Sequence, residues 1–149
     1  MGKTIVWATL VAGTLDILSA FAWTLLAGGK PAKVLPSVAS GPFGDVIKAN
    51  SLAAPLGLAV HFALMLAMVV TYVYVAARVP ALRRQWLGAG MLYGVLLWWV
   101  MYWIVLPLRF GIPHPSNAAA ITRQLISHVL LVGIPIAWIA ARRPTGKRR

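Results

Sequence analysis

The stretch 53–77, AAPLGLAVHFALMLAMVVTYVYVAA, contains no Asp, Glu, Lys or Arg over a length that can cross a bilayer. A helix needs about 20 predominantly apolar residues to span the hydrocarbon core. In that core, only helices and closed barrels satisfy every backbone polar group. His61 is the one side chain of the stretch that can carry a positive charge. The stretch therefore predicts a transmembrane helix.

Three further apolar stretches have the length of a span, at residues 5–27, 87–107 and 119–141. Asp16 lies in the middle of what would be the apolar core of a signal peptide, so we expect the first stretch to be a retained helix. The third stretch is uncharged, and the fourth has a polar first turn and is then apolar. We predict an all-α fold, a four-helix transmembrane bundle that forms a single domain over residues 1–149.

The composition excludes several other classes of protein. The chain is 60% hydrophobic and only 11% charged, about half the charged share of a soluble domain. It has no cysteine, which excludes disulfides and thiolate metal sites. Its two acids, Asp16 and Asp45, are too few for a paired-carboxylate catalytic site inside the membrane. We therefore expect a protein that is not an enzyme.

The net charge of +12 comes from fourteen basic residues, which lie at the ends of the apolar spans. Basic residues there orient a chain in the bilayer, so we expect no nucleic-acid partner. Nine of them lie on the side of the two termini: Lys3, Arg78, Arg83, Arg84, Arg142, Arg143, Lys147, Arg148 and Arg149. Five lie on the opposite side: Lys30, Lys33, Lys48, Arg109 and Arg123. The positive-inside rule predicts cytoplasmic termini and a basic cytoplasmic tail at 142–149.

The two predicted outer loops differ in length. The first, 28–52, is rich in Gly, Pro and Ser and also contains apolar residues. It is either a segment lying on the membrane interface or a plain ordered loop. In the short second loop, Ser116 or Asn117 is a good N-cap for the last helix.

Short similarities between the spans suggest two pseudo-repeated helical hairpins. Ala12–Leu15 (AGTL) resembles Ala89–Leu92 (AGML), although Ala, Gly and Leu also match by chance in membrane spans. His61 and His128 each lie about nine residues into their spans, which places both about 13 Å below the outer boundary. Asp16, on a helix running the other way, lies within about one helical turn of that level.

Ionisable residues inside a span are candidate functional residues, because burying charge in hydrocarbon is costly. Here they are Asp16, His61 and His128. His61 and His128 could be the two axial ligands of a b-type haem, whose iron needs only two protein ligands. We expect no other metal site. Alternatively, all three residues form a proton or ion relay. A third interpretation makes the histidines neutral hydrogen-bonding groups that fix the packing.

A wider polar cluster surrounds these residues in the predicted bundle. Gln124, Ser127 and His128 share one face of the last helix at i, i+3 and i+4 spacing. Arg123 lies at the end of that helix, where its side chain can reach the interface. We expect an ion path or buried polar cluster formed by Asp16, His61, Arg123, Gln124, Ser127 and His128.

Small and aromatic residues form further stripes on the predicted helices. Gly90 and Gly94 on the third span, and Gly133 and Ala137 on the fourth, predict close helix packing in the bundle interior. Pro135 predicts a kink. A flat apolar ligand could stack in a pocket formed by Trp98, Trp99, Tyr102, Met65 and Met68. The alternative is that these side chains face lipid or fill the core.

Three segments carry a resemblance to a known group of proteins. They are LAVHFALMLAMVVTYVYVAARVPALRR (58–84), GMLYGVLLWWVMYWIVLPL (90–108) and HVLLVGIPIAWIAARR (128–143). This sequence resembles small bacterial inner-membrane proteins with four predicted spans, best around His61 and from His128 to Ala137. The resemblance implies the fold and a bacterial inner membrane, and it implies no activity.

The function expected first is that of a non-enzymatic membrane protein, either an accessory subunit or a binder of an apolar ligand or cofactor. Its expected partners are the lipid bilayer and another membrane protein or a second copy of itself, because the Gly and Ala seams suit further helix contacts. The alternatives are a b-type haem electron-transfer protein ligated by His61 and His128, and a small transporter or proton path that uses Asp16.

Overall fold

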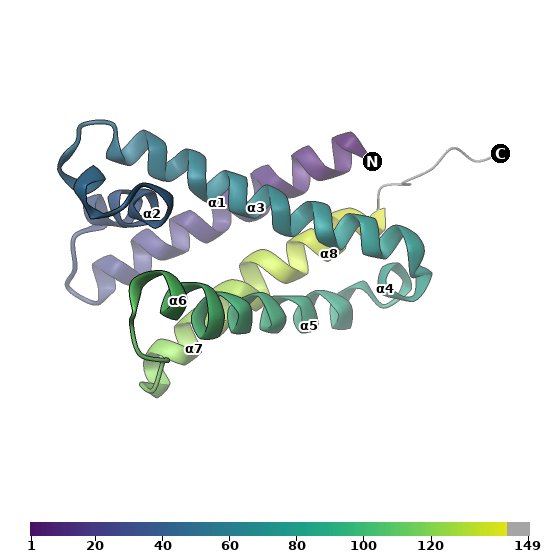
Figure 1. Cartoon of the computed structure of the whole chain (residues 1–149). Helices are drawn as coiled ribbons and strands as arrows, with labels where there is room; N and C mark the ends of the chain where they lie inside the picture. Colours follow the sequence, from purple (N-terminus) through teal and green to yellow (C-terminus); the bar gives the residue numbers. More distant parts are fainter. Residues whose placement is uncertain (143–149) are drawn as a thin grey trace.

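The computed structural model describes residues 1–142, and all regular secondary structure in this part of the chain is helical (Figure 1). Four continuous helices are long and apolar enough to cross a membrane: Gly2–Leu26, Ala53–Arg78, Trp86–Phe110 and Ala118–Arg142. The first two are α1 and α3. The third consists of α5 (Trp86–Trp99), η3 (Val100–Val105) and α6 (Leu106–Phe110), and the fourth of α7 (Ala118–Ile126), η4 (Ser127–Gly133) and α8 (Ile134–Arg142). The all-α bundle predicted from the apolar stretches is confirmed.

The bundle has two ends with different contents (Figure 1). The N-terminus, the short helix α4 (Pro80–Arg84) and the end of α8 lie together at one end, here called the α4 end. The other end, here called the α2 end, holds η1 (Pro31–Lys33), α2 (Val34–Phe43) and η2 (Asp45–Ala49). The predicted tail 142–149 lies outside the described residues except for Arg142.

Helices α1 and α3 form the first hairpin, and they approach closely at Gly13. A Cβ atom on Gly13 would lie 2.6 Å from Cε1 of Phe62, so a larger residue would displace the Phe62 ring. At the same level, Nε2 of His61 donates a hydrogen bond to the carbonyl oxygen of Gly13 at 2.9 Å. The first hairpin is therefore fixed by a small residue and a buried polar contact at one place.

The second hairpin is packed even more tightly, backbone against backbone. A Cβ atom on Gly90 would lie 2.9 Å from the Gly133 carbonyl oxygen and 3.0 Å from Cβ of Ala137. A Cβ atom on Gly94 would lie 2.6 Å from Cα of Val129. The prediction that the small residues of these two helices meet inside the bundle is confirmed.

Apolar side chains close the half of the bundle near the α4 end. The buried set includes Ala8, Ala12, Val69, Val73, Ala76, Ile136, Ala137 and Ala140, each at most 1% exposed. Two tyrosines tie this core together: the Tyr93 hydroxyl donates to the Met68 carbonyl at 2.7 Å, and its ring lies 5.0 Å from that of Tyr72. This half is filled by side chains.

The third and fourth helices each contain a wider, π-helical segment, and both segments end two residues before a proline. Val100–Val105 precedes Pro107, and Ser127–Gly133 precedes Pro135. Proline lacks an N–H group and its ring clashes with the carbonyl four residues earlier. Widening the preceding turn relieves that clash. The kink predicted at Pro135 thus takes the form of a π-helical segment that contains His128.

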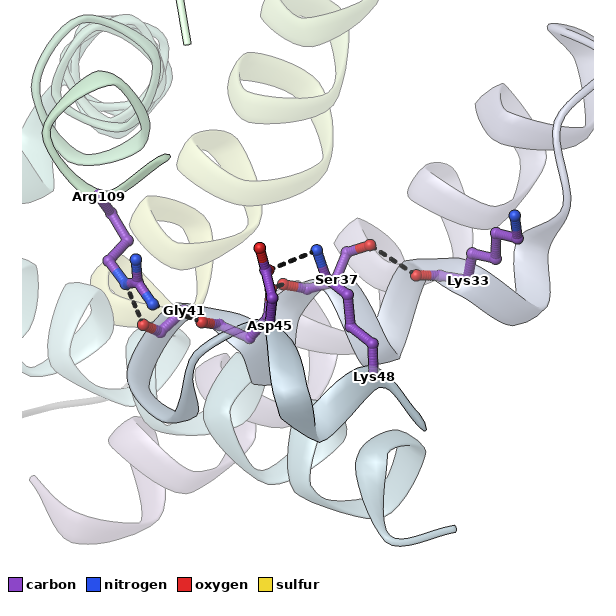
Figure 2. Close-up of polar contacts among 7 residues, drawn as sticks. Lys33, Ser37, Gly41, Asp45, Lys48 and Arg109 are labelled. Carbon is purple, nitrogen blue, oxygen red and sulfur yellow. Dashed lines mark hydrogen bonds and ion pairs between the residues drawn. The ribbon is translucent and has the colours of Figure 1, made fainter. Parts of the chain in front are cut away.

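The loop 28–52 folds over the α2 end and contains the helix α2, which packs on α3. The approach is so close that a Cβ atom on Gly57 would overlap the Leu35 backbone. The last carbonyls of a helix lack partners within it. At the end of α2 the Ser40 carbonyl accepts from the Gly44 N–H at 3.0 Å, and Arg109 of α6 adds donors to the Ser40 carbonyl at 2.8 Å and to that of Gly41 (Figure 2).

The same close-up shows a surface ion pair within the loop. Nζ of Lys48 lies 2.7 Å from the Asp45 carboxylate (Figure 2). The Lys48 hydrogen bond and charge hold the pKa of the Asp45 carboxyl below its ordinary value. At the other predicted outer loop, Asn117 accepts a hydrogen bond from the backbone N–H of Ala120 at 3.0 Å. Of the two N-cap candidates, Asn117 is the one used.

Candidate functional site

In the half of the bundle near the α2 end, polar side chains of α1 meet the start of η4. The Trp23 indole N–H donates to the Ser127 hydroxyl oxygen, and the hydroxyl groups of Ser19 and Ser127 are hydrogen-bonded to each other, each contact at 3.0 Å. The one hydrogen of Ser19 is directed to the Asp16 backbone carbonyl at 2.8 Å, so Ser127 is the donor to Ser19. Ser127 is only 5% exposed, and the three-residue contact is partly buried. It fixes Ser19 and Ser127 at the same depth along two antiparallel helices.

The third helix contributes aromatic side chains to the same region. The Trp98 indole N–H donates to the Gln124 side-chain carbonyl at 3.1 Å. The Tyr102 ring packs edge-on against the His128 ring, with their centroids 5.7 Å apart. Gln124 and His128 are thus oriented by neighbouring aromatic groups, while Ser127 between them faces α1.

Between these groups lies an open cavity of about 450 Å³, here called the vestibule. It is lined by Asp16, Ser19, Ala20, Trp23, Thr24, Ala27, Gly29, Tyr102, Ala120, Arg123, Gln124, Ser127 and His128. Ala27 and Gly29 follow the end of α1, and Ala120 lies in the first turn of α7, so the vestibule opens at the α2 end. Its volume falls in the range of roughly 300–1,000 Å³ typical of small-molecule sites.

The vestibule contains one acidic and one basic side chain, Asp16 and Arg123. Among residues 1–142, the one ion pair joins Asp45 and Lys48, so these two charges are not paired with each other. Asp16 is three residues deeper than Ser19, and Arg123 is four residues nearer the mouth than Ser127. At 1.5 Å per residue, the two positions are about 10 Å apart along the helix axes. Asp16 therefore lies at the bottom of the vestibule, and Arg123 lies near its mouth.

A second, smaller cavity of about 60 Å³ lies below the vestibule. Asp16, His61 and His128 all line it, together with Leu64, Met65, Met68, Met101 and Val132. The structure therefore brings together the three ionisable residues that the sequence places inside the spans. Asp16 and His128 line both cavities, whereas His61 lines the smaller one and not the vestibule.

The hydrogen bonds of the two histidines fix their tautomers. A carbonyl oxygen only accepts, so Nε2 of His61 carries the hydrogen that it donates to Gly13. Nδ1 of His128 likewise donates to the Gln124 carbonyl at 2.9 Å. His61 is buried and His128 is half-buried. Both make the interhelical or local contacts expected of histidines that fix packing.

This geometry does not fit a bis-histidine haem. Nε2 of His61 is already bonded to Gly13, and the space shared by His61 and His128 is about 60 Å³. Sites for cofactors and drug-sized ligands are at least about 300 Å³. Within residues 1–142, no group of three or more His, Cys, Asp or Glu side chains is placed to hold a metal ion.

The aromatic and methionine residues predicted to form an apolar ligand pocket are brought together only in pairs: the Trp98 and Tyr102 rings stack with their centroids 6.4 Å apart, and Met65 and Met68 lie together elsewhere. Trp99 is 47% exposed on the outer surface of the bundle. Trp98 is bonded to Gln124, Tyr102 lines the vestibule, and Met65 and Met68 line the smaller cavity. The spacing of these residues along their helices predicts how far apart they lie along the helix axes, but it does not predict the direction in which each side chain points.

Two features of the site were not found from the sequence. Ser19 lies three residues from Asp16 and four from Trp23, so a search for polar residues on one face of the first span would have found it. The sequence indicates Arg109 only as an orienting charge, whereas its contact with α2 joins residues 68 and 69 positions apart. No local pattern encodes such a contact.

Comparisons with protein-family models, curated proteins and solved structures gave no match. The function therefore has to be inferred from the geometry of the vestibule.

Proposed function

We propose that this is a non-enzymatic protein of the bacterial inner membrane that binds a small molecule in the vestibule. The observation that carries the proposal is an open cavity of about 450 Å³ with a carboxyl group, that of Asp16, at its base. A charged group inside a span is costly and is characteristic of a functional site. The binder expected from the sequence is retained, but the Asp16 and Arg123 side chains in the lining favour a ligand with polar groups over a wholly apolar one.

The orientation supports a vestibule open to the outside of the cell. The basic residues of the α4 end among residues 1–142 are Lys3, Arg78, Arg83, Arg84 and Arg142. By the positive-inside rule this end is cytoplasmic, so the α2 end faces the periplasm. The resemblance of the spans to small bacterial inner-membrane proteins supports the same location. Association with another membrane protein or a second copy stays a prediction.

Filling the vestibule tests the proposal. Ala20 lines the vestibule, and Ala63 on α3 is exposed on the outer surface of the bundle. The variant Ala20→Trp blocks the site, and Ala63→Trp is its matched control. The probes are four-carbon molecules of each charge type: butylamine, butyrate, 4-aminobutyrate and butanol. A ligand at about 100 times its Kd stabilises the folded state by about 2.7 kcal/mol.

We expect at least one probe to raise the unfolding temperature of the detergent-purified wild type and of Ala63→Trp, but not of Ala20→Trp. A probe that stabilises all three proteins equally binds elsewhere. If no probe distinguishes Ala20→Trp from the other two, the vestibule is not the binding site and the proposal fails.

A proton path is a second candidate, favoured by one observation. Asp16 and His128 line both cavities, and His61 lines the inner one, so three titratable groups follow one another from the mouth inward. The smaller cavity, about 60 Å³, has room for water, which needs at least about 10–15 Å³. Acidification of proteoliposomes that enclose a pH-sensitive dye measures the flux. A flux that Asp16→Asn abolishes supports this function, and wild-type flux no faster than in empty liposomes excludes it.

A further inference from the structure

We propose that the ligand of the vestibule is a small zwitterion, bound with its ammonium group at Asp16 and its acidic group at Arg123. The proposal rests on the proposed function, because it names the ligand class of the same site. It goes beyond that function in assigning both the charges of the ligand and its direction in the cavity.

The first argument is which polar groups of the lining are still free to bind. Ser19 donates to the Asp16 backbone carbonyl and is bonded to Ser127, Trp23 donates to Ser127, and Thr24 donates to the Ala20 carbonyl at 2.7 Å. Gln124 accepts from Trp98. Asp16 and Arg123 line the cavity, and neither joins the one ion pair found among residues 1–142. They are the two groups with full charges for a ligand to engage.

The second argument is the balance of charge. The lining contains one acid and one arginine, so the vestibule is neutral overall but polarised along its length. A simple amine would satisfy Asp16 and leave the arginine without a counter-charge, and a simple acid would do the reverse. Removing an unpaired charge from water is unfavourable, whereas a ligand with both charges compensates each one. The Trp23 and Tyr102 rings in the lining also suit an ammonium group.

The third argument is spacing. Asp16 and Arg123 are about 10 Å apart along the helix axes. The two side chains enter the cavity from backbone positions about two helical turns apart, so a ligand that bridges them has to reach two different depths. This favours an amine and an acid separated by several bonds over an α-amino acid, in which both groups flank one carbon. The same chemistry occurs in free ω-amino acids and in the phosphoethanolamine headgroup of a lipid.

The experiment measures the affinities of four probes by calorimetry on detergent-purified protein: 4-aminobutyrate, glycine, butylamine and butyrate. In the wild type we expect 4-aminobutyrate to bind at least about tenfold more tightly than the other three, since each lost charge-assisted bond costs that much or more. In Asp16→Asn, 4-aminobutyrate should bind no better than butyrate. In Arg123→Gln, it should bind no better than butylamine. Arg123→Lys keeps the charge and should retain part of the preference.

Folding of each variant is checked by its elution volume and helical circular dichroism. A variant that does not fold is replaced by Asp16→Ser or Arg123→Met. The source of the zwitterion is tested in nanodiscs. If phosphatidylethanolamine, compared with phosphatidylcholine, weakens the binding of 4-aminobutyrate, the headgroup occupies the site; if the two lipids act alike, the free solute does. Either result is compatible with the proposed chemistry.

Two results would overturn the inference. Butylamine or butyrate binding as tightly as 4-aminobutyrate would show that one charge suffices, and the vestibule would still be a binding site. Equal loss of all probes in both variants would show that the two residues do not recognise separate ends of the ligand. Failure of the proposed function is a different outcome, in which no probe distinguishes Ala20→Trp from Ala63→Trp.

Discussion

The two halves of the bundle use the same four helices in opposite ways. Near the α4 end, the interior is filled by Ala, Val and Ile side chains that are at most 1% exposed. Near the α2 end, polar and aromatic side chains of α1, η3 and α7 surround a vestibule of about 450 Å³. One half is a packed core and the other encloses an open cavity, although the helices are continuous through both.

The difference comes from which residues occupy the facing positions. Gly90 and Gly133 bring the backbones of α5 and the fourth helix into direct contact. Farther toward the α2 end, Trp23, Tyr102 and Gln124 occupy the interior. These side chains are too large for backbone contact, and their polar groups bind one another. Small residues therefore close one half of the bundle, and bulky amphipathic residues hold the other half open.

Substitutions in the closed half of the bundle, near the α4 end, should reduce the stability most. In Gly133→Ala, the new methyl group would lie 2.6 Å from the Gly94 nitrogen and 2.8 Å from its Cα, so the helices must separate. We expect a loss of about 1–3 kcal/mol of stability, as for overpacked cores. The matched control is Gly88→Ala, because nothing lies within 4 Å of a Cβ at Gly88. Thermal unfolding followed by circular dichroism measures both. Equal stabilities would contradict the backbone contact.

A substitution in the open half of the bundle, near the α2 end, should cause a smaller but measurable loss of stability. Ser127→Ala leaves the Trp23 indole N–H without its acceptor and removes the hydroxyl bonded to Ser19, which keeps its bond to the Asp16 carbonyl. An unpaired buried donor costs about 1–3 kcal/mol, and the nearby cavity can supply water that reduces this cost. We expect a net loss of about 1–2 kcal/mol. Thr71→Ala on the exposed surface of α3 is the control and should change little.

A substitution of Arg109 tests whether α6 holds α2 in place at the α2 end. Arg109→Gln removes the donors to the Ser40 and Gly41 carbonyls. We expect about 1 kcal/mol of lost local stability, and faster hydrogen exchange confined to α2 and η2. Arg84→Gln at the opposite end is the control. Unchanged exchange in α2 would show that its packing on α3 alone holds it.

The smallest effect concerns the Asp45–Lys48 pair, which is exposed. Because the folded state lowers the pKa of Asp45, the pair adds stability above the unfolded value of 3.8 and loses it as the pH falls through the lower, folded value. Lys48→Gln should raise the pKa of Asp45 toward 3.8 without a measurable change in the unfolding temperature at neutral pH. Titration of the Asp45 carboxyl carbon by NMR checks the direction.

The fold could be predicted because each span can be recognised from one continuous stretch of sequence. Length and the absence of charge identify four helices, and the glycines at 90, 94 and 133 identify a close contact. Depth along an axis also follows from counting, which is why Asp16, His61 and His128 were expected near one level. The rotation of each helix does not follow from counting. The sequence therefore left open whether Trp99 faces inward, and it could not show that Asp16 and Arg123 line one cavity.

The vestibule is open at the α2 end and sealed toward the α4 end, and the accessibility of single cysteines tests this arrangement directly. The chain has no cysteine, so single substitutions report on one position each. The variants are Ala20→Cys in the vestibule and Ala76→Cys in the packed core. A membrane-impermeant methanethiosulfonate is added to right-side-out or inverted vesicles. We predict that Ala20→Cys reacts only from the outer face and Ala76→Cys from neither. An unreactive Ala20→Cys, or equal reaction at both positions, would contradict this arrangement.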